Sequence, residues 1–155
     1  NSILFYIKTK YKKVSDDDAN LIAKYLVKYG SEHDVDPKLT AALMARESAF
    51  NKEAVSSTGA KGLGQIKNFN FKTLQIEDPF DIQQNTYGTT KYMKYLMSSW
   101  QTNSEKVSLA LASYFKGINA VKRQNGDLDP KTQGYVQDIL KNYDEMSAKI
   151  GRAHV

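Results

Sequence analysis

Apolar residues recur at three- and four-residue steps along much of the chain, which is the spacing of an amphipathic α-helix. One such pattern follows Ser15, which with Asp18 resembles the capping box that starts a helix. Gly30 is expected to end or weaken this helix. Its apolar face is made of Leu21, Ile22, Tyr25, Leu26 and Tyr29.

Asp36 and Pro37 predict the start of a second helix, because Asp is a favoured N-cap and Pro is tolerated at the first helical position. Two leucines lie four and eight residues before Glu47, so its carboxyl group continues the apolar side. Burial and the negative end of the helix dipole should both raise the pKa of Glu47. A general acid needs such a pKa. The alternative is a boundary carboxylate bonded to Ser48 or to loop amides.

Helical patterns continue through the rest of the chain. They predict a short helical piece near residues 69–74, a longer helix between Pro79 and Trp100, a helix capped by Ser104 and stopped by Gly117, a short helix around residues 120–123, and a final helix through Tyr135 and Tyr143. No segment alternates clearly enough to require a sheet. We therefore predict an all-α, lysozyme-like fold class, with room for a minor β-ribbon near the glycine-rich loop at residues 59–64.

The length of 155 residues favours one domain, without internal repeats or low-complexity linkers. We place an N-terminal extension at residues 1–14 and the core at about residues 15–147. No apolar run has the length of a membrane span. The chain starts without an initiator methionine, which is compatible with a signal peptide or membrane anchor removed before Asn1. Residues 3–13, apolar and then lysine-rich, are either the flank of such an anchor or a simple basic helix.

The net charge is +5, and nineteen of the twenty-two basic residues are lysine. Specific nucleic-acid recognition usually recruits arginine, so we predict no specific nucleic-acid partner. A lysine-rich surface fits loose attraction to an anionic polymer or membrane, or a solvated surface with no partner. Cysteine is absent, and His33 and His154 are far apart, so we predict no metal site.

A set of short motifs resembles the soluble lytic transglycosylase family, lysozyme-like enzymes that cut bacterial peptidoglycan. The motifs are Glu47-Ser48-Ala49-Phe50, Ala54-Val55-Ser56, Gly59-Ala60-Lys61-Gly62-Leu63-Gly64-Gln65, the Asp78-Pro79 to Tyr92 segment, Ala112-Ser113-Tyr114 and Tyr135-Val136. The resemblance covers roughly residues 21–143, and its specific part runs from Glu47 to Gln65. It implies a helical goose-lysozyme-like fold and a groove for glycan strands of alternating N-acetylglucosamine and N-acetylmuramic acid.

The resemblance also implies roles for individual residues. Glu47 would be the sole catalytic acid and base, and the Tyr135 hydroxyl would orient its carboxyl group. The substrate-binding positions would be Ser48, Ser56, Gln65, Tyr114 and Phe115. The alternative interpretation makes the serines and Gln65 loop-bracing groups and the tyrosines core aromatics with a bonded hydroxyl.

Three positions depart from the family pattern. Gly64 stands where methionine is usual, Lys67-Asn68 replaces methionine and proline, and Phe115 stands where asparagine is expected. The first two change the apolar wall of the implied groove. The third removes an amide that would help to hold the sugar.

The implied activity is that of a peptidoglycan lytic transglycosylase, which forms 1,6-anhydro-N-acetylmuramic acid ends without metal or cofactor. The alternatives are a hydrolytic goose-type lysozyme, which needs a second acid to hold water, and a catalytically weak peptidoglycan-binding scaffold. The implied location is the periplasm or cell envelope after export. The chain could also be one component of a larger cell-envelope machine or phage particle.

Overall fold

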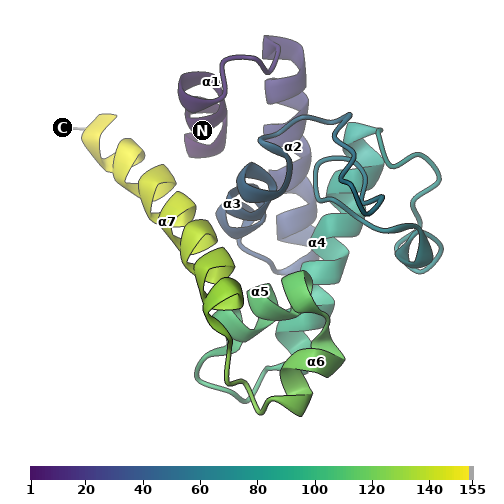
Figure 1. Cartoon of the computed structure of the whole chain (residues 1–155). Coiled ribbons are helices and arrows are strands. Elements are labelled where there is room, and N and C mark those ends of the chain that lie inside the picture. Colours follow the sequence, from purple (N-terminus) through teal and green to yellow (C-terminus); the bar gives the residue numbers. More distant parts are fainter. Residues whose placement is uncertain (154–155) are drawn as a thin grey trace.

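The computed structural model describes the backbone of residues 1–153 and the side chains of residues 1–148 (Figure 1). The helices in this range are α1 (Ser2–Lys10), α2 (Asp16–His33), α3 (Pro37–Ser48), the short 3-10 helix η1 (Asn68–Asn70), α4 (Ile82–Ser99), α5 (Lys106–Lys116), α6 (Ile118–Arg123) and α7 (Pro130–Ala153). In place of a ribbon, two isolated antiparallel bridges join Lys61 to Val55 and to Ile66. The predicted all-α fold class is confirmed.

Two helices, α2 and α3, begin where the sequence predicts a local cap. The Ser15 hydroxyl accepts a hydrogen bond from the Asp18 N–H at 3.1 Å, and an Asp36 carboxylate oxygen accepts one from the Lys38 N–H at 3.0 Å. Pro37 is the first residue of α3. These bonds satisfy amide groups that have no partner inside the first helical turn.

The predicted stop at Gly30 is wrong, because α2 continues to His33 and ends at Asp34, which is left-handed with a φ of 55°. A Cβ atom on Gly30 would lie 2.7 Å from the Val35 carbonyl oxygen. The glycine therefore lets the returning chain pass close to the helix, and it does not break the helix.

The predicted cap at Ser104 is also wrong, because α5 begins at Lys106 and its N-cap position is Glu105. The Asn103 side chain accepts a hydrogen bond from the Glu105 N–H at 2.8 Å. This local turn organises the segment in place of a serine cap. The predicted stop at Gly117 is confirmed, and its φ of 92° is one that glycine adopts readily.

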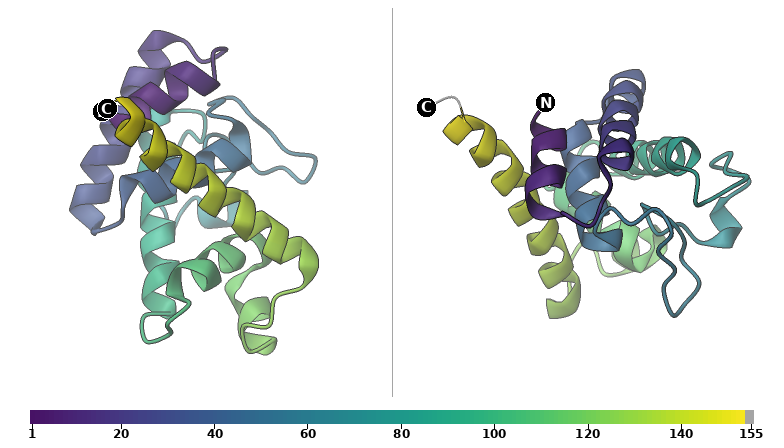
Figure 2. Two further views of the ribbon diagram at one scale, coloured as in Figure 1. Left: turned by 90° about the vertical axis from the view of Figure 1, so that its left-hand side faces the viewer. Right: turned by 90° about the horizontal axis from the view of Figure 1, so that it is seen from above.

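The core is built around α3, which is buried over most of its length. It packs between α2 and α7, and α4 packs against both α2 and α5. Figures 1 and 2 show α7 on one side of α3 and the long connection at residues 49–81 projecting on the other side. The C-terminal end of α3 therefore lies between the last helix and the glycine-rich loop.

The first helix belongs to this core through three of its side chains, Ile3, Tyr6 and Ile7. Lys10, in its basic last turn, forms an ion pair with Glu145 of α7 at 2.5 Å. The structure thus shows the apolar and then basic start of the chain as a packed helix. Among the described residues, no helix combines the length and apolar character needed to cross a bilayer.

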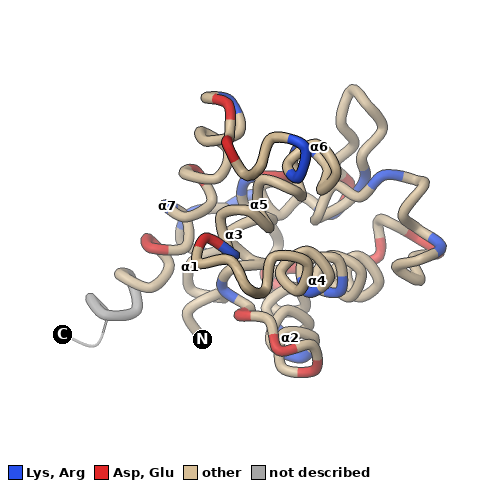
Figure 3. Tube along the Cα trace, turned by 90° about the horizontal axis from the view of Figure 1, so that it is seen from below, with Lys and Arg blue, Asp and Glu red and all other residues tan. Residues whose placement is uncertain are grey.

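Charged residues are spread over the molecule. Figure 3 shows basic and acidic positions interspersed on the helices and on the long connection. Acidic and basic positions are thus mixed in this view, and the absence of a specific nucleic-acid partner stays a prediction.

Candidate active site

Glu47 lies in the last turn of α3, half-buried, and its carboxylate oxygen Oε2 accepts a hydrogen bond from the Tyr135 hydroxyl at 2.5 Å. Tyr135 is on α7 and is almost completely buried. Burial raises the pKa of Glu47 above its ordinary value, while the Tyr135 hydroxyl and the Arg46 charge lower it in part. Because burial outweighs these two effects, the carboxyl group holds its proton at a higher pH than a solvated glutamate.

The ring of Tyr135 is held by two neighbours. Phe115 of α5 stacks on it, with ring centroids 4.4 Å apart and planes 23° apart. The Arg46 guanidinium lies 5.2 Å from the same ring centroid and pairs with Asp138 at 3.4 Å. Stacking and the cation–π contact leave the Tyr135 ring little freedom, so its hydroxyl stays directed at Glu47.

Phe115, the clearest departure from the family pattern, faces the candidate groove. Its side chain is 37% exposed and lines a cavity of about 200 Å³ together with Gln65, Phe69, Tyr92 and Tyr114. Phe69, which also lines this cavity, is 78% exposed. Aromatic rings that are open to solvent offer apolar faces on which the C–H groups of a sugar can pack.

Tyr114 fastens the glycine-rich loop to α5. Its hydroxyl donates a hydrogen bond to the Gly64 carbonyl oxygen at 2.5 Å, and its ring lies against Tyr92 at 5.2 Å. Burial raises the pKa of Tyr114, and the nearby charge of Glu47 adds to this effect. Tyr114 thus borders the acid as expected, but its hydroxyl bonds to the loop.

Asn85 of α4 holds the same loop from inside and was missed as a site residue. Its side-chain oxygen accepts a hydrogen bond from the Gly64 N–H at 2.9 Å, and its amide donates to the Lys61 and Pro79 carbonyl oxygens. It is 1% exposed. The sequence carries one signal for this role, an asparagine on the apolar side of a predicted helix. A buried amide needs several hydrogen-bond partners, so such a residue is expected to hold neighbouring backbone.

Gln65 lies at the end of this loop with a φ of 54°. Its side-chain amide donates to the carbonyl oxygens of Ala54 and Gly62, both at 3.0 Å, while part of the side chain lines the cavity. The structure therefore brings Gln65, Tyr114 and Phe115 to one cavity. Gln65 braces the loop and also lines this cavity, and its contact with a sugar stays a prediction.

The two serines are engaged with the protein backbone. The Ser48 hydroxyl lies 3.1 Å from the Met44 carbonyl oxygen and 2.8 Å from that of Leu63. The Ser56 hydroxyl accepts from the Ala60 N–H at 3.0 Å. These contacts agree with the loop-bracing interpretation, and sugar binding by either serine stays a prediction.

Gly64 is required by a close approach of α4. A Cβ atom there would lie 2.0 Å from Thr89 Oγ1, and the φ of Gly64 is not positive. Any side chain, the methionine of the family pattern included, would therefore collide with Thr89. Lys67 lines the cavity and Asn68 begins η1, so that departure also changes the groove wall.

Potential metal ligands do not gather in this structure: within the described residues, no three His, Cys, Asp or Glu side chains are placed to hold an ion. His33 is half-buried, and its Nδ1 lies 3.0 Å from the Tyr29 carbonyl oxygen. His154 lies outside the described residues.

The profile of the Transglycosylase SLT domain family matches residues 24–134 of the chain. The matched span contains Glu47, Gln65 and Tyr114 and ends one residue before Tyr135. The chain belongs to this family. The similarity that the motifs indicated is thereby confirmed over most of the domain.

Relatives of this SLT domain include bacterial and phage proteins. It is 36% identical over 87 residues to the membrane-bound lytic murein transglycosylase F of Pectobacterium atrosepticum, covering 54% of this chain and 18% of that protein. It is 26% identical over 121 residues to the transglycosylase of Enterobacteria phage PRD1, covering 78% of this chain and 42% of the phage protein. The chain thus spans less than half the length of these curated relatives.

Two solved structures share the fold. The 70 kDa soluble lytic transglycosylase of Escherichia coli superposes with a TM-score of 0.70 at 23% identity, over 83% of this chain and 24% of that one. An inactive mutant of the lytic transglycosylase Slt of Pseudomonas aeruginosa superposes with a TM-score of 0.70 at 21% sequence identity, and the same shares of the two chains are covered. Together they confirm the predicted lysozyme-like architecture of this SLT domain.

Proposed function

We propose that this SLT domain is a peptidoglycan lytic transglycosylase that cuts the β-1,4 bond between N-acetylmuramic acid and N-acetylglucosamine. The observation that carries the proposal is the pairing of a half-buried Glu47, whose pKa is raised by burial, with the fixed Tyr135 hydroxyl. Family membership and the names of the relatives support the same substrate.

In the proposed reaction, Glu47 gives its proton to the glycosidic oxygen as the bond to the anomeric carbon breaks. The resulting carboxylate then removes the proton of the muramic acid 6-hydroxyl while that oxygen bonds to the anomeric carbon. The products are a 1,6-anhydro end and a free 4-hydroxyl, and Glu47 is protonated again. The atoms balance without water or a cofactor, since one residue serves as acid and then as base.

The surroundings of two acidic residues, Asp81 and Asp129, argue against either of them as the second acid of a hydrolase. Asp81 caps α4 by accepting from the Gln84 N–H at 2.9 Å. Asp129 accepts from the Thr132 N–H and pairs with Lys116, whose hydrogen bond lowers the pKa of Asp129 to about 2. A hydrolase of the goose-lysozyme kind would need such a carboxylate free to hold water.

Glu47→Gln should lower cleavage of purified sacculi by about a hundredfold to ten-thousandfold, because the amide keeps the shape but cannot donate and recover a proton. Mass analysis of the released muropeptides measures both rate and product. Wild-type protein should release 1,6-anhydro ends. Release of reducing ends would instead establish the hydrolase, and a variant that keeps most of its activity would remove Glu47 from the mechanism.

The wider setting of the domain is part of the proposal. Its partners would be peptidoglycan glycan strands in the cell envelope, reached after export. The phage relative supports the alternative that the domain is one component of a phage particle. The alternative of a catalytically weak, peptidoglycan-binding scaffold has Phe115 as its only support. The sacculus assay tests it, because a scaffold would bind sacculi without releasing muropeptides.

A further inference from the structure

An exposed ion pair lies next to the candidate acid, and the proposed reaction does not use it. Arg46 precedes Glu47 on α3, and its Nε atom lies 3.4 Å from Oδ2 of Asp138 on α7. The two side chains are 41% and 62% exposed. An ion pair this open to solvent contributes little to the stability of the fold. Stability alone therefore does not explain why the pair is placed beside the site.

Asp138 lies one helical turn after Tyr135. Residues three positions apart in an α-helix are neighbours on one face, so the Asp138 side chain is a neighbour of the Tyr135 ring. The Arg46 guanidinium that it pairs with lies over that ring, 5.2 Å from its centroid. Phe115 stacks on the ring at 4.4 Å, and the two groups would collide on one face at these distances. Arg46 and Phe115 therefore hold the ring from opposite sides.

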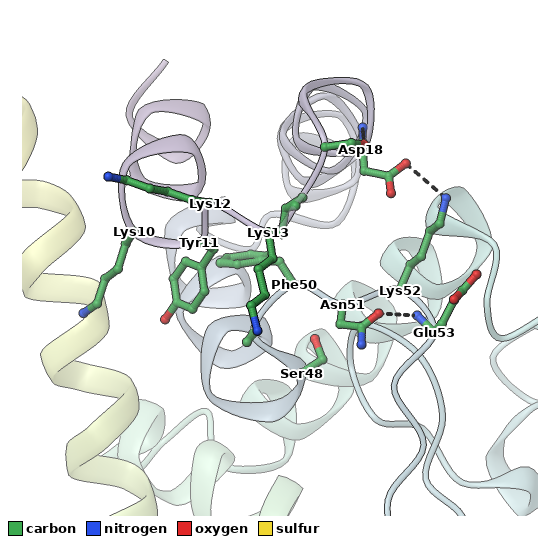
Figure 4. Close-up of a pocket in the computed structure, with 13 residues that line it drawn as sticks. Lys10, Tyr11, Lys12, Lys13, Asp18, Ser48, Phe50, Asn51, Lys52 and Glu53 are labelled. Atoms are coloured by element: carbon green, nitrogen blue, oxygen red, sulfur yellow. Dashed lines mark hydrogen bonds and ion pairs between the residues drawn. The ribbon is translucent and has the colours of Figure 1, made fainter.

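A second ion pair joins α7 to another helix at the same hollow. This hollow has a volume of about 300 Å³, and its lining includes Lys10, Arg46, Asp138, Lys141 and Glu145. Figure 4 shows the Lys10 side chain extending from α1 toward α7, where it pairs with Glu145 at 2.5 Å. Within the described residues, Asp138 forms an ion pair only with Arg46, and none is found for Lys141. The two carboxylates of α7 thus hold different cations.

Arg46 also acts on Glu47 through its charge. In the part of the chain that the structure describes, the charged or titratable groups found near Glu47 are Arg46 on its own helix, Tyr135 of α7 and Tyr114 of α5. The Tyr135 hydroxyl and the Arg46 charge both lower the pKa of Glu47. Asp138 is largely exposed, so solvent and salt screen its own charge from Glu47. Its effect on the acid is therefore expected to pass through Arg46 and the Tyr135 ring.

We propose that Asp138 is a positioning residue of the reaction, because it holds the Arg46 guanidinium over the Tyr135 ring. The held ring keeps its hydroxyl on Glu47. The inference rests on the proposed function, since that reaction uses the Glu47 carboxyl group. Loss of the Asp138 carboxylate would free the guanidinium and loosen the ring.

The direction of the resulting pKa shift separates this role from a direct charge effect. The Arg46 charge and the Tyr135 hydroxyl favour the ionised form of Glu47, so weakening either contact raises the pKa of Glu47. Removal of a nearby negative charge would by itself do the opposite, because it makes ionisation of Glu47 easier. A higher pKa of Glu47 after Asp138→Asn is therefore the mark of positioning.

The test compares Asp138→Asn with Glu145→Gln, which neutralises the other paired carboxylate of α7 and is the matched control. Muropeptide release from sacculi is measured across the pH range. Asp138→Asn should lower turnover about twofold to fivefold, the effect of one exposed ion pair, and should move the high-pH limb of activity to higher pH. Glu145→Gln should change neither. A limb that stays or moves to lower pH, or equal losses in both variants, would overturn the proposal.

A double-mutant cycle tests whether Asp138 acts through Arg46. In the Arg46→Met protein the guanidinium is already absent, so adding Asp138→Asn should cause no further loss of turnover. Loss by the same factor with and without Arg46 would contradict this route.

A direct titration of Glu47 keeps the test independent of cleavage. The pKa of its carboxyl group is measured by carbon NMR in the wild type and in the two single variants. It should rise in Asp138→Asn and stay unchanged in Glu145→Gln. A fall or no change in Asp138→Asn would rule out the positioning role. A wild type that cuts no sacculi would sink the proposed function, while this titration still judges Asp138.

Discussion

At the scale of single residues, the pair formed by Glu47 and Tyr135 determines how the candidate acid responds to pH. The hydroxyl donates to the carboxylate, so it favours the ionised form and opposes the effect of burial on the pKa of Glu47. The proposed reaction begins with Glu47 protonated. Activity is therefore expected to fall as pH rises through the pKa of Glu47.

Tyr135→Phe removes this bond, so the pKa of Glu47 should rise further and the high-pH limb of activity should move to higher pH. Turnover at the optimum should fall, because the carboxyl group loses its orienting contact. Rates of muropeptide release measured across the pH range test both effects. An unmoved pH limb and unchanged turnover, combined with a lower melting temperature, would make Tyr135 a core residue only.

Phe115→Asn restores the family's usual residue and removes a ring that stacks on Tyr135. Because Phe115 is partly exposed, the stability cost should be limited to about 0.5–1.5 kcal/mol, the worth of an aromatic pair. Turnover or substrate preference should change more clearly than stability. Urea unfolding and muropeptide release on the same protein test this, with Phe115→Tyr as a control that keeps the stack. If neither property changes, the departure at position 115 is neutral.

At the scale of elements, the glycine-rich loop is held between α4 and α5. Asn85 and Thr89 approach it from α4, and the Tyr114 hydroxyl approaches it from α5. The loop can come this close only because Gly64 has no side chain. The position of Gln65, the next residue, therefore depends on the fit between Gly64 and Thr89.

Gly64→Ala should destabilise the domain by about 1–3 kcal/mol, the usual cost of overpacking. The added Cβ would meet two side-chain atoms of Thr89 that Thr89→Ala removes, leaving a contact of 3.0 Å with its Cβ. Gly64→Ala should hence cost less in the Thr89→Ala background than in the wild type. Urea unfolding of the four proteins measures this coupling. An equal cost in both backgrounds would show that Thr89 is not the obstacle.

At the scale of the whole molecule, local signals predicted the fold well and long-range contacts caused the errors. The caps at Ser15 and Asp36 act within three residues, so the sequence displays them directly. Gly30 was misjudged because its role depends on the Val35 carbonyl oxygen in the returning chain. Ser104 was misjudged because Asn103 forms a competing turn.

In the candidate site, too, some residues could be predicted from the sequence and others could not. Glu47 could be found from helix periodicity and Tyr135 from the family resemblance. The contacts of Arg46 and Phe115 with the Tyr135 ring bring together segments that no sequence period relates. Such contacts become visible only when α3, α5 and α7 have been placed relative to one another.

The hydrogen bond between Glu47 and Tyr135 joins residues 88 positions apart, and this separation orders events during protein synthesis. A ribosome delivers the N-terminal part first, so Glu47 emerges long before the residue that orients it. During that interval the nascent chain carries its acid without the hydroxyl of the last helix. In the proposed mechanism, the full rate of cleavage therefore requires that this last helix has docked beside α3.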